Sequence, residues 1–217
     1  MKIVEGLLWI TGIALLLAYA TASAWGEHER VQGIAAFALA RDPGMQSARL
    51  TPGPDAAESA WANPTAAVHP VTVRAQAQQH DRGELPIAVL RIPRIALEVP
   101  VRHGTQDPVL ARGAGLVEGS PLPGTPGNVA IAAHRDSFFR GLRDVAVGDL
   151  VELDAMDRTL IYRITDLSIV EPRDVHVLDE IGEPALTLVT CYPFQFVGRA
   201  PQRFIVRAVV HATPTST

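Results

Sequence analysis

The chain has 217 residues, a formal net charge of −4 and an apolar fraction of 47%, enough for one domain of ordinary size with appended segments. Blocks of Lys or Arg interleaved with aromatic residues are absent, and together with the negative net charge this excludes nucleic acid as a partner. The single cysteine, Cys191, cannot form an internal disulfide. It is therefore kept for its reactivity, paired between chains, or buried as an inert thiol.

The first predicted element is an N-terminal membrane span. Leu7 to Trp25 is a run of nineteen residues without a charge, long enough at ~1.5 Å per residue to cross most of a ~30 Å hydrocarbon core. Trp9, Tyr19 and Trp25 lie towards its ends, as interfacial aromatic rings do. We expect residues 1–26 to form a cytoplasmic tip and a single-pass anchor in the plasma (inner) membrane, with the remaining chain outside the cytoplasm.

A cleaved signal peptide is the alternative interpretation of this segment. Ala22-Ser23-Ala24 resembles a small-residue cleavage site. The apolar run is longer than the roughly 7–15 residues of a signal-peptide core, and the positive charge before it is weak, so the anchor is favoured. In both cases the globular part leaves the cytoplasm.

Residues 27–83 are predicted to hold the domain away from the bilayer. Glu27 to Arg41 can continue as an extracytoplasmic helix, with Phe37 off its apolar face. That face would consist of Val31, Ile34, Ala35, Ala38 and Leu39. Residues 42–83 are rich in Ala, Pro, Gln, Ser and Gly without a sustained period, which indicates a flexible stalk. His69 and His80 lie in it as bystanders.

From residue 84 the chain changes to short β runs separated by Pro and Gly. Eight strands are predicted: Ile87–Ile92, Leu97–Arg102, Asn128–His134, Leu150–Asp154, Thr159–Val170, Val175–Leu178, Leu186–Cys191 and Phe204–Val210. Only Asp107–Ala114 and Phe138–Asp144 have helical character. A mainly β fold, either a closed barrel or a sandwich, is therefore expected.

Three chemically useful side chains fall at the ends of three predicted strands. One run ends on the thiol of Cys191, another ends on the imidazole of His134, and the last begins with Arg203. Strand alternation puts Ala132 on the same face as His134, where a small residue leaves room for a ligand. Alternation also turns Arg203 away from the apolar face of its own strand.

The chemistry that uses this set is acyl transfer. A free thiol has a pKa near ~8.5, so a neighbouring imidazolium or guanidinium is needed to favour the thiolate. His134 can deprotonate the thiol and protonate a leaving amine, and Arg203 can hold a developing oxyanion. Asp136 is close to His134 in sequence, but a solvated turn residue is favoured over an orienting role.

At these residues the sequence resembles the sortase family of membrane-anchored cysteine transpeptidases. The resemblance extends over about residues 86–212 and rests on motifs in a fixed order: Leu90–Pro93 with Pro100-Val101, Gly127–Arg135, Gly148-Asp149, Thr187–Pro193 and Ala200–Val206. The TLxTC pattern with a downstream arginine is its most specific part. Tyr192-Pro193-Phe194, followed by Phe196-Val197-Gly198, looks most like the class D and Gram-negative (GN) branches.

This resemblance implies an eight-stranded sortase-type β-barrel with short helices over residues 84–213, with His134, Cys191 and Arg203 as catalytic residues. It implies a protein substrate with a C-terminal LPXTG-like sorting signal, cleaved after its threonine to form a thioacyl-enzyme, and an amine acceptor that completes the anchoring of a surface protein. Thr190, Ala132 and Tyr192 would contribute to substrate binding, Thr190 through its hydroxyl. The alternative for Thr190 is a strand residue on the face opposite Cys191.

No cofactor is expected. Some members of the family bind calcium through loop carboxylates, and the chain offers a weak candidate set for which a solvated acidic loop is the favoured interpretation. The set consists of Glu171, Asp174, Asp179, Glu180 and Glu183.

Three functions remain open from the sequence. They are a transpeptidase, a cysteine endopeptidase that uses the same residues with water as acceptor, and a non-catalytic membrane-anchored module that binds a peptide and keeps an inert thiol. An L,D-transpeptidase would show His-Gly and Ser-x-Gly-Cys-x-Arg features, which this sequence lacks.

Overall fold

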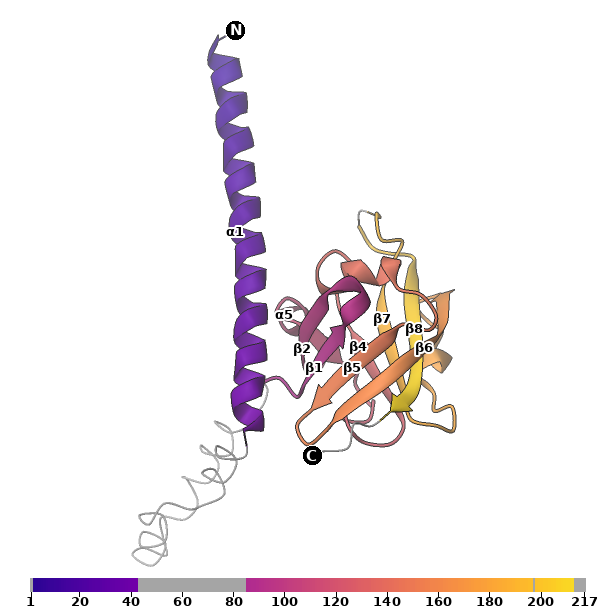
Figure 1. Cartoon of the computed structure of the whole chain (residues 1–217). Coiled ribbons are helices and arrows are strands. Elements are labelled where there is room, and N and C mark those ends of the chain that lie inside the picture. The colour runs from indigo at the N-terminus through magenta and orange to yellow at the C-terminus, as the bar shows by residue number, and fades with distance from the viewer. Residues whose placement is uncertain (1, 43–84, 197, 213–217) are drawn as a thin grey trace, which may run out of the picture.

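Eight strands close into a barrel in the second half of the chain (Figure 1). The computed structural model describes residues 2–42, 85–196 and 198–212, so nearly all of the predicted stalk, with His69 and His80, lies outside the described residues. The strands are β1 (Ala88–Ile92), β2 (Leu97–His103), β3 (Ala114–Leu116), β4 (Asn128–Ala132), β5 (Leu150–Ala155), β6 (Thr159–Val170), β7 (Ala185–Tyr192) and β8 (Gln202–Ala212). Their order around the barrel is β1-β2-β3-β4-β7-β8-β6-β5, which confirms the mainly β, eight-stranded architecture.

Alternate residues of each strand point into the barrel. On β4, β7 and β8 the inward residues include Ile131, Leu188 and Val206, and none of them has exposed surface. Tyr162 of β6 lies in the same core, and burial raises the pKa of its phenol to about 12. The outward residues of these three strands are therefore the ones that can meet a ligand, as the alternation predicts.

One predicted strand is wrong and one strand was missed. Val175–Leu178 forms the short 3-10 helix η3 instead of a strand, while β3 takes the eighth place in the barrel. The helix expected over Asp107–Ala114 ends early, as α5 (Asp107–Leu110). The chain then runs close beside β2, because a Cβ on Gly115 would lie 2.0 Å from the carbonyl oxygen of Gly104.

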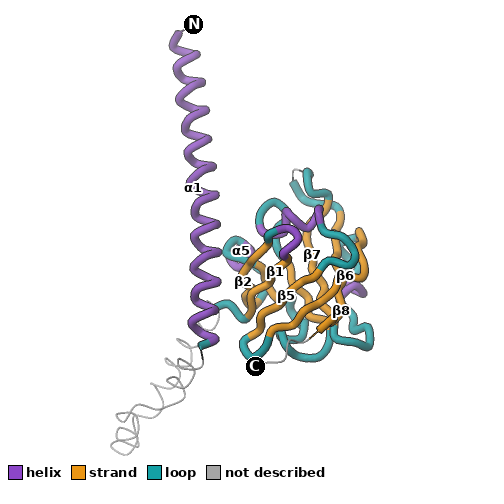
Figure 2. Tube along the Cα trace, in the orientation of Figure 1, coloured by secondary structure: helices purple, strands orange, loops and turns teal. Residues whose placement is uncertain are grey.

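Short helices lie over the barrel ends (Figure 2). The predicted helical piece Phe138–Asp144 forms as the 3-10 helix η2, directly after the turn that follows β4. A further 3-10 turn, η1 (Pro93–Ile95), links β1 to β2. These two short helices contact one another, so the region beside the end of β4 is built from segments far apart in sequence.

The helix α1 (Lys2–Arg41) runs without interruption, and its C-terminal part lies against β1 and β2 (Figures 1 and 2). The predicted apolar face of this part is wrong. Phe37 is 3% exposed, whereas Val31 and Leu39 are 52% and 60% exposed. Close approach sets the face, because a Cβ on Gly33 would lie only 2.8 Å from Cγ of Pro100.

The N-terminal part of α1 projects beyond the barrel (Figure 1). Its described apolar side chains are exposed, among them Trp9, Ile10, Ile13, Leu15, Leu16 and Leu17. The side chains of residues 1–8, 18–20 and 22–25, which make up much of the predicted span, lie outside the described residues. Within the part that is described, no helix has the length and apolar character needed to cross a membrane.

Candidate active site

The three predicted catalytic residues lie in one row across the outer faces of neighbouring strands. Strand β7 lies between β4 and β8, and Cys191 pairs directly with Arg203 across the β7–β8 ladder. Ala132 pairs with Val189 in the parallel β4–β7 ladder, so His134, two residues further, comes level with Cys191. With neighbouring strands ~4.8 Å apart, imidazole, thiol and guanidinium share one end of this face.

All three side chains are partly exposed, which leaves them accessible to a substrate. Within the described part of the chain, neither the imidazole of His134 nor the thiol of Cys191 has a hydrogen-bond partner. Asp136 is exposed and makes no bond to His134 there. Its position fits the solvated turn residue that the sequence favoured.

Backbone bonds fix the chain on both sides of His134. The amide of Ala133 donates to the carbonyl of Val189 over 3.3 Å, and the amide of Phe139 donates to the carbonyl of His134 over 3.0 Å. The hydroxyl of Thr190 donates to the carbonyl of Ala133 over 2.8 Å. Since Thr190 is 2% exposed and on the face opposite Cys191, its hydroxyl acts by holding the two strand ends together.

Arg203 keeps part of its guanidinium uncommitted. Its Nη1 donates to the carbonyls of Gln202 at 3.0 Å and Ala200 at 3.4 Å, which anchors the side chain at the start of β8. No described residue accepts a hydrogen bond from its Nη2 or Nε. These donors can therefore meet a developing negative charge beside Cys191.

Arg207 has a structural role, unlike Arg203. Its Nη2 donates to the carbonyl of Val177 over 2.7 Å. The same carbonyl accepts a 3.4 Å hydrogen bond from Nδ2 of the Asn128 side chain. Thr187 in turn donates to Oδ1 of Asn128 over 2.8 Å. This network holds the segment around η3 against the outer face, four residues along β7 and β8 from the row of Cys191 and Arg203.

Between these two places lies an apolar row that crosses the three strands. Val189 pairs with Ala132 on one side and with Ile205 on the other. Ala132 and Val189 are partly exposed, and Ile205 is buried. This row lies next to the thiol, and Ala132 and Val189 are the side chains of the row that a ligand can reach.

Arg135 is a residue whose role the sequence did not reveal. It is 9% exposed, and its guanidinium donates to three carbonyls of the β7–β8 loop: Pro193 at 3.1 Å, Phe196 at 2.6 Å and Gly198 at 3.1 Å. The same group lies 5.8 Å from the ring centroid of Phe196. Arg135 thus ties the segment after His134 to the segment after Cys191.

Tyr192 belongs to an aromatic group at the end of β7. Its ring centroid lies 5.9 Å from that of Phe194 and 6.3 Å from that of Phe204, and the last two rings are 5.3 Å apart. Phe194 and Phe204 pack against the barrel core, while Tyr192 stays partly exposed. Tyr192 therefore lies on the same face of β7 as Thr190, opposite Cys191, and is partly exposed there.

The acidic loop does not gather into a cation site. In residues 2–42, 85–196 and 198–212, no group of three or more His, Cys, Asp or Glu side chains is placed to hold a metal ion. The carboxylate of Asp174 accepts the backbone N–H of Glu171 over 3.0 Å, a contact that stabilises the loop itself.

Comparison with known proteins agrees with this geometry. The family model of the Sortase domain matches residues 90–211. Sortase D of Bacillus subtilis (strain 168) is 34% identical over 119 residues, covering 54% of this chain and 60% of that protein. The chain thus spans about three fifths of the length of this relative, and the likeness to a Sortase D supports the predicted class D resemblance.

Two solved structures of sortases are similar to this barrel. A Sortase D5 transpeptidase of Clostridium perfringens matches with a TM-score of 0.55 at 25% identity, over 64% of this chain and 89% of that one. Sortase C of Streptococcus pneumoniae, studied for its catalysis and pilin substrate specificity, matches with a TM-score of 0.56 at 32% identity, over 60% of this chain and 69% of that one.

Proposed function

Since the chain belongs to the sortase family, we propose that it is a cysteine transpeptidase in which His134, Cys191 and Arg203 carry the reaction. The observation that supports this most is the shared row across β4, β7 and β8, with Cys191 paired to Arg203 and His134 level with both. A nucleophile, a proton carrier and an oxyanion donor meet on one partly exposed surface.

In the first half of the reaction, the sulfur of Cys191 attacks the scissile carbonyl of the substrate peptide. His134 takes the thiol proton and gives it to the leaving amine, and the uncommitted donors of Arg203 stabilise the oxyanion. The C–N bond breaks and a thioester on Cys191 remains. In the second half, an acceptor amine attacks the thioester, its proton passes to His134, and the thiolate leaves.

The proposed substrate is a surface protein that carries a C-terminal LPXTG-like sorting signal. The partly exposed side chains of Ala132 and Val189, with the buried Ile205 beside them, offer a surface next to the thiol for the apolar residues of such a signal. The partly exposed Tyr192 would contribute from the end of β7, and Thr190 would contribute through the strand ends that it joins.

The test uses the full chain in detergent with a fluorogenic LPXTG-type peptide and glycinamide as the amine. We expect peptide cleavage, an amide product with glycinamide, and loss of both in Cys191→Ala with an unchanged far-UV circular dichroism spectrum. Cleavage without any amide product would identify a cysteine endopeptidase instead. If the thiol resists iodoacetamide and no peptide is cleaved, the chain is a non-catalytic binding module.

We further propose that residues 1–26 anchor the protein in the plasma membrane and that residues 84–213 form the extracytoplasmic catalytic domain. The uncharged run from Leu7 to Trp25 supports this, as do the exposed apolar side chains of the described part of α1. Intact cells with protease added outside should lose the domain, and alkaline carbonate should leave the protein in the membrane pellet. Release by carbonate would rule out the anchor.

A further inference from the structure

A cavity of about 710 Å³ lies between α1 and the barrel, beside His134. Its walls come from α1, from Ala96 and the start of β2, from Ala111 after α5, and from the segment that follows β4. The charged and titratable residues in these walls are Glu27, Arg30, Glu98, His134 and Asp136. Part of the wall thus comes from the same helix that carries the proposed membrane anchor.

We infer that this cavity admits the acceptor amine and that α1 forms one wall of the acceptor site, an inference that rests on the proposed transpeptidase function. The thioacyl group is attached to Cys191 and extends over the outer face of the three strands. The second substrate must reach the thioester while its proton reaches His134. The cavity contacts His134 but not Cys191, so it offers an approach beside the acyl group.

The charge of the cavity suits a primary ammonium ion. Three carboxylates and one guanidinium line the cavity, and the guanidinium of Arg91 pairs with Glu98 from outside it. Arg30 is already engaged, since its Nε donates to Glu27 over 3.0 Å and its Nη1 lies 3.8 Å from a carboxylate oxygen of Glu98. The bond from Arg30 lowers the pKa of Glu27, which keeps that carboxylate ionised. Asp136 makes no ion pair with any described residue, so its charge adds to the attraction of a cation.

The chemical step then balances without a further reactant. The ammonium gives one proton to a solvent water as it approaches, and the neutral nitrogen attacks the thioester carbon. The C–N bond forms, the C–S bond breaks, and the sulfur of Cys191 leaves as thiolate. The second proton of the attacking nitrogen passes to His134, which then protonates the thiolate.

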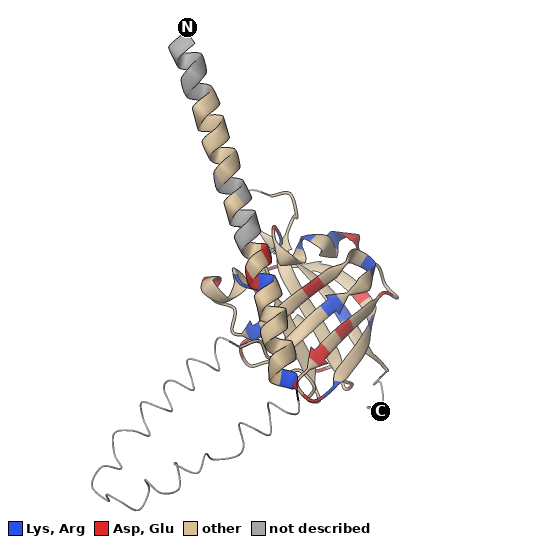
Figure 3. Cartoon of the chain, turned by 60° about the vertical axis from the view of Figure 1, so that its left-hand side comes forward, with Lys and Arg blue, Asp and Glu red and all other residues tan. Residues whose placement is uncertain are grey.

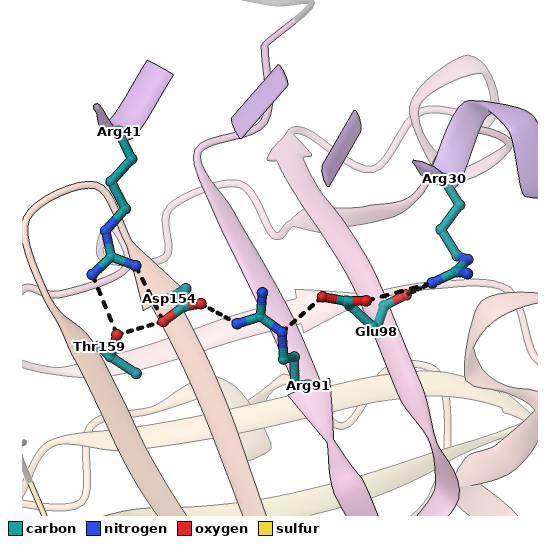
Figure 4. Close-up of polar contacts among 6 residues, drawn as sticks. All are labelled: Arg30, Arg41, Arg91, Glu98, Asp154 and Thr159. Atoms are coloured by element: carbon teal, nitrogen blue, oxygen red, sulfur yellow. Dashed lines mark hydrogen bonds and ion pairs between the residues drawn. The ribbon is translucent and has the colours of Figure 1, made fainter. Parts of the chain in front are cut away.

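A chain of alternating charges holds α1 in place as a wall (Figure 4). Arg41 of α1 lies 3.3 Å from Asp154, Asp154 pairs with Arg91, Nε of Arg91 lies 2.8 Å from Glu98, and Glu98 meets Arg30 of α1. The chain begins and ends on the helix and crosses β5, β1 and β2 between. Figure 3 shows charges of both signs where the helix meets the barrel.

Apolar contacts complete this attachment. Phe37 is buried against the barrel, and Gly33 lets the helix approach Pro100 closely. About one turn before Gly33 on the same stripe of the helix, Glu29 accepts a hydrogen bond from Nε of Arg112 over 3.0 Å. The cavity wall formed by α1 therefore has a fixed position relative to His134.

The test measures how the thioacyl-enzyme divides between glycinamide and water. For the full chain in detergent, with the LPXTG-type peptide and subsaturating glycinamide, we expect Glu27→Gln and Asp136→Asn each to lower the ratio of amide to hydrolysis product about threefold, as for an exposed charge pair. The double variant should lower it roughly tenfold. Gly33→Val, which pushes α1 away from Pro100, should lower it as well.

Two controls make the result specific. Glu118→Gln changes an exposed carboxylate outside the cavity and should leave the ratio unchanged. Hydroxylamine is uncharged at neutral pH. With hydroxylamine as the acceptor, the ratio of hydroxamate to hydrolysis product should therefore change less than twofold in the Glu27 and Asp136 variants. If the wild-type protein transfers the acyl group to glycinamide but the double variant keeps the wild-type ratio, the acceptor-site inference is wrong while the proposed function stands. If wild type does not cleave the peptide, the proposed function fails.

Discussion

Replacing Arg135 tests whether the β7–β8 loop must be held for catalysis. Arg135→Met removes three charge-assisted bonds, to the carbonyls of Pro193, Phe196 and Gly198, each worth about 1.5–3 kcal/mol. The freed carbonyls lie in a partly exposed loop and regain water, so we expect a net loss of about 2 kcal/mol in loop ordering. That loss lowers the equilibrium constant for the ordered loop about thirtyfold.

The loop joins the strand of Cys191 to the strand of Arg203, so its disorder should appear in turnover. We expect kcat for peptide cleavage to fall about tenfold or more in Arg135→Met, and Arg135→Lys to fall between Met and wild type because one or two bonds survive. Limited proteolysis should cut residues 193–200 faster in the Met variant. Arg140→Met, at an exposed position of η2, is the matched control. Wild-type kcat in Arg135→Met would refute this reasoning.

Three further outcomes are expected. Arg203→Lys should lower turnover ~10²- to 10³-fold, about 2.7–4 kcal/mol, with little change in Tm. As the control, Arg163→Lys at an exposed position should leave turnover unchanged. Full activity in both variants would remove Arg203 from the catalytic set. Deleting residues 1–80 should leave peptide cleavage but lower Tm, since the burial of Phe37 contributes about 2 kcal/mol; a folded but inactive fragment would contradict this. Burial alone would raise the pKa of Asp154, but its hydrogen bonds and ion pairs outweigh burial and lower the pKa. The stability that Asp154 contributes is therefore present above about pH 4 and is lost as the pH falls through the lowered pKa. Asp154→Asn should lower Tm at pH 7 and much less at pH 2, and an equal drop in Tm at both pH values would contradict the ion-pair role.

The row of catalytic candidates was accessible from sequence because strand alternation and strand ends are local properties. A run that ends on Cys191 and another that ends on His134 place both side chains without knowledge of the partner strands. The structure adds the register, in which Cys191 and Arg203 are direct partners. The expectation for Val175–Leu178 failed because the polar groups of that run bond to side chains, with the carbonyl of Val177 held by Asn128 and Arg207.

Contacts between segments far apart in the chain could not be predicted from the sequence in the same way. Arg135 bonds to backbone carbonyls 58–63 residues away, and any residue type can supply a carbonyl. The buried face of α1 was misread because apolar periodicity favours large side chains. Here the close approach at Gly33 and Pro100 decides which side of the helix faces the barrel, and Phe37 follows from that rotation.

In the proposed reaction, the order of elements on the surface would give the two substrates separate routes. Going across the row, α1 and its cavity lie on the side of His134, and the start of β8 lies on the side of Arg203. The peptide carbonyl must reach the donors of Arg203, so its chain extends over the outer face of β7 and β8. An amine that enters through the cavity meets the thioester from the other side and finds the proton acceptor first. Because Gly26 lines that cavity directly after the proposed span, the acceptor would enter close to the membrane, and the orientation of α1 would decide which amines can reach the thioester.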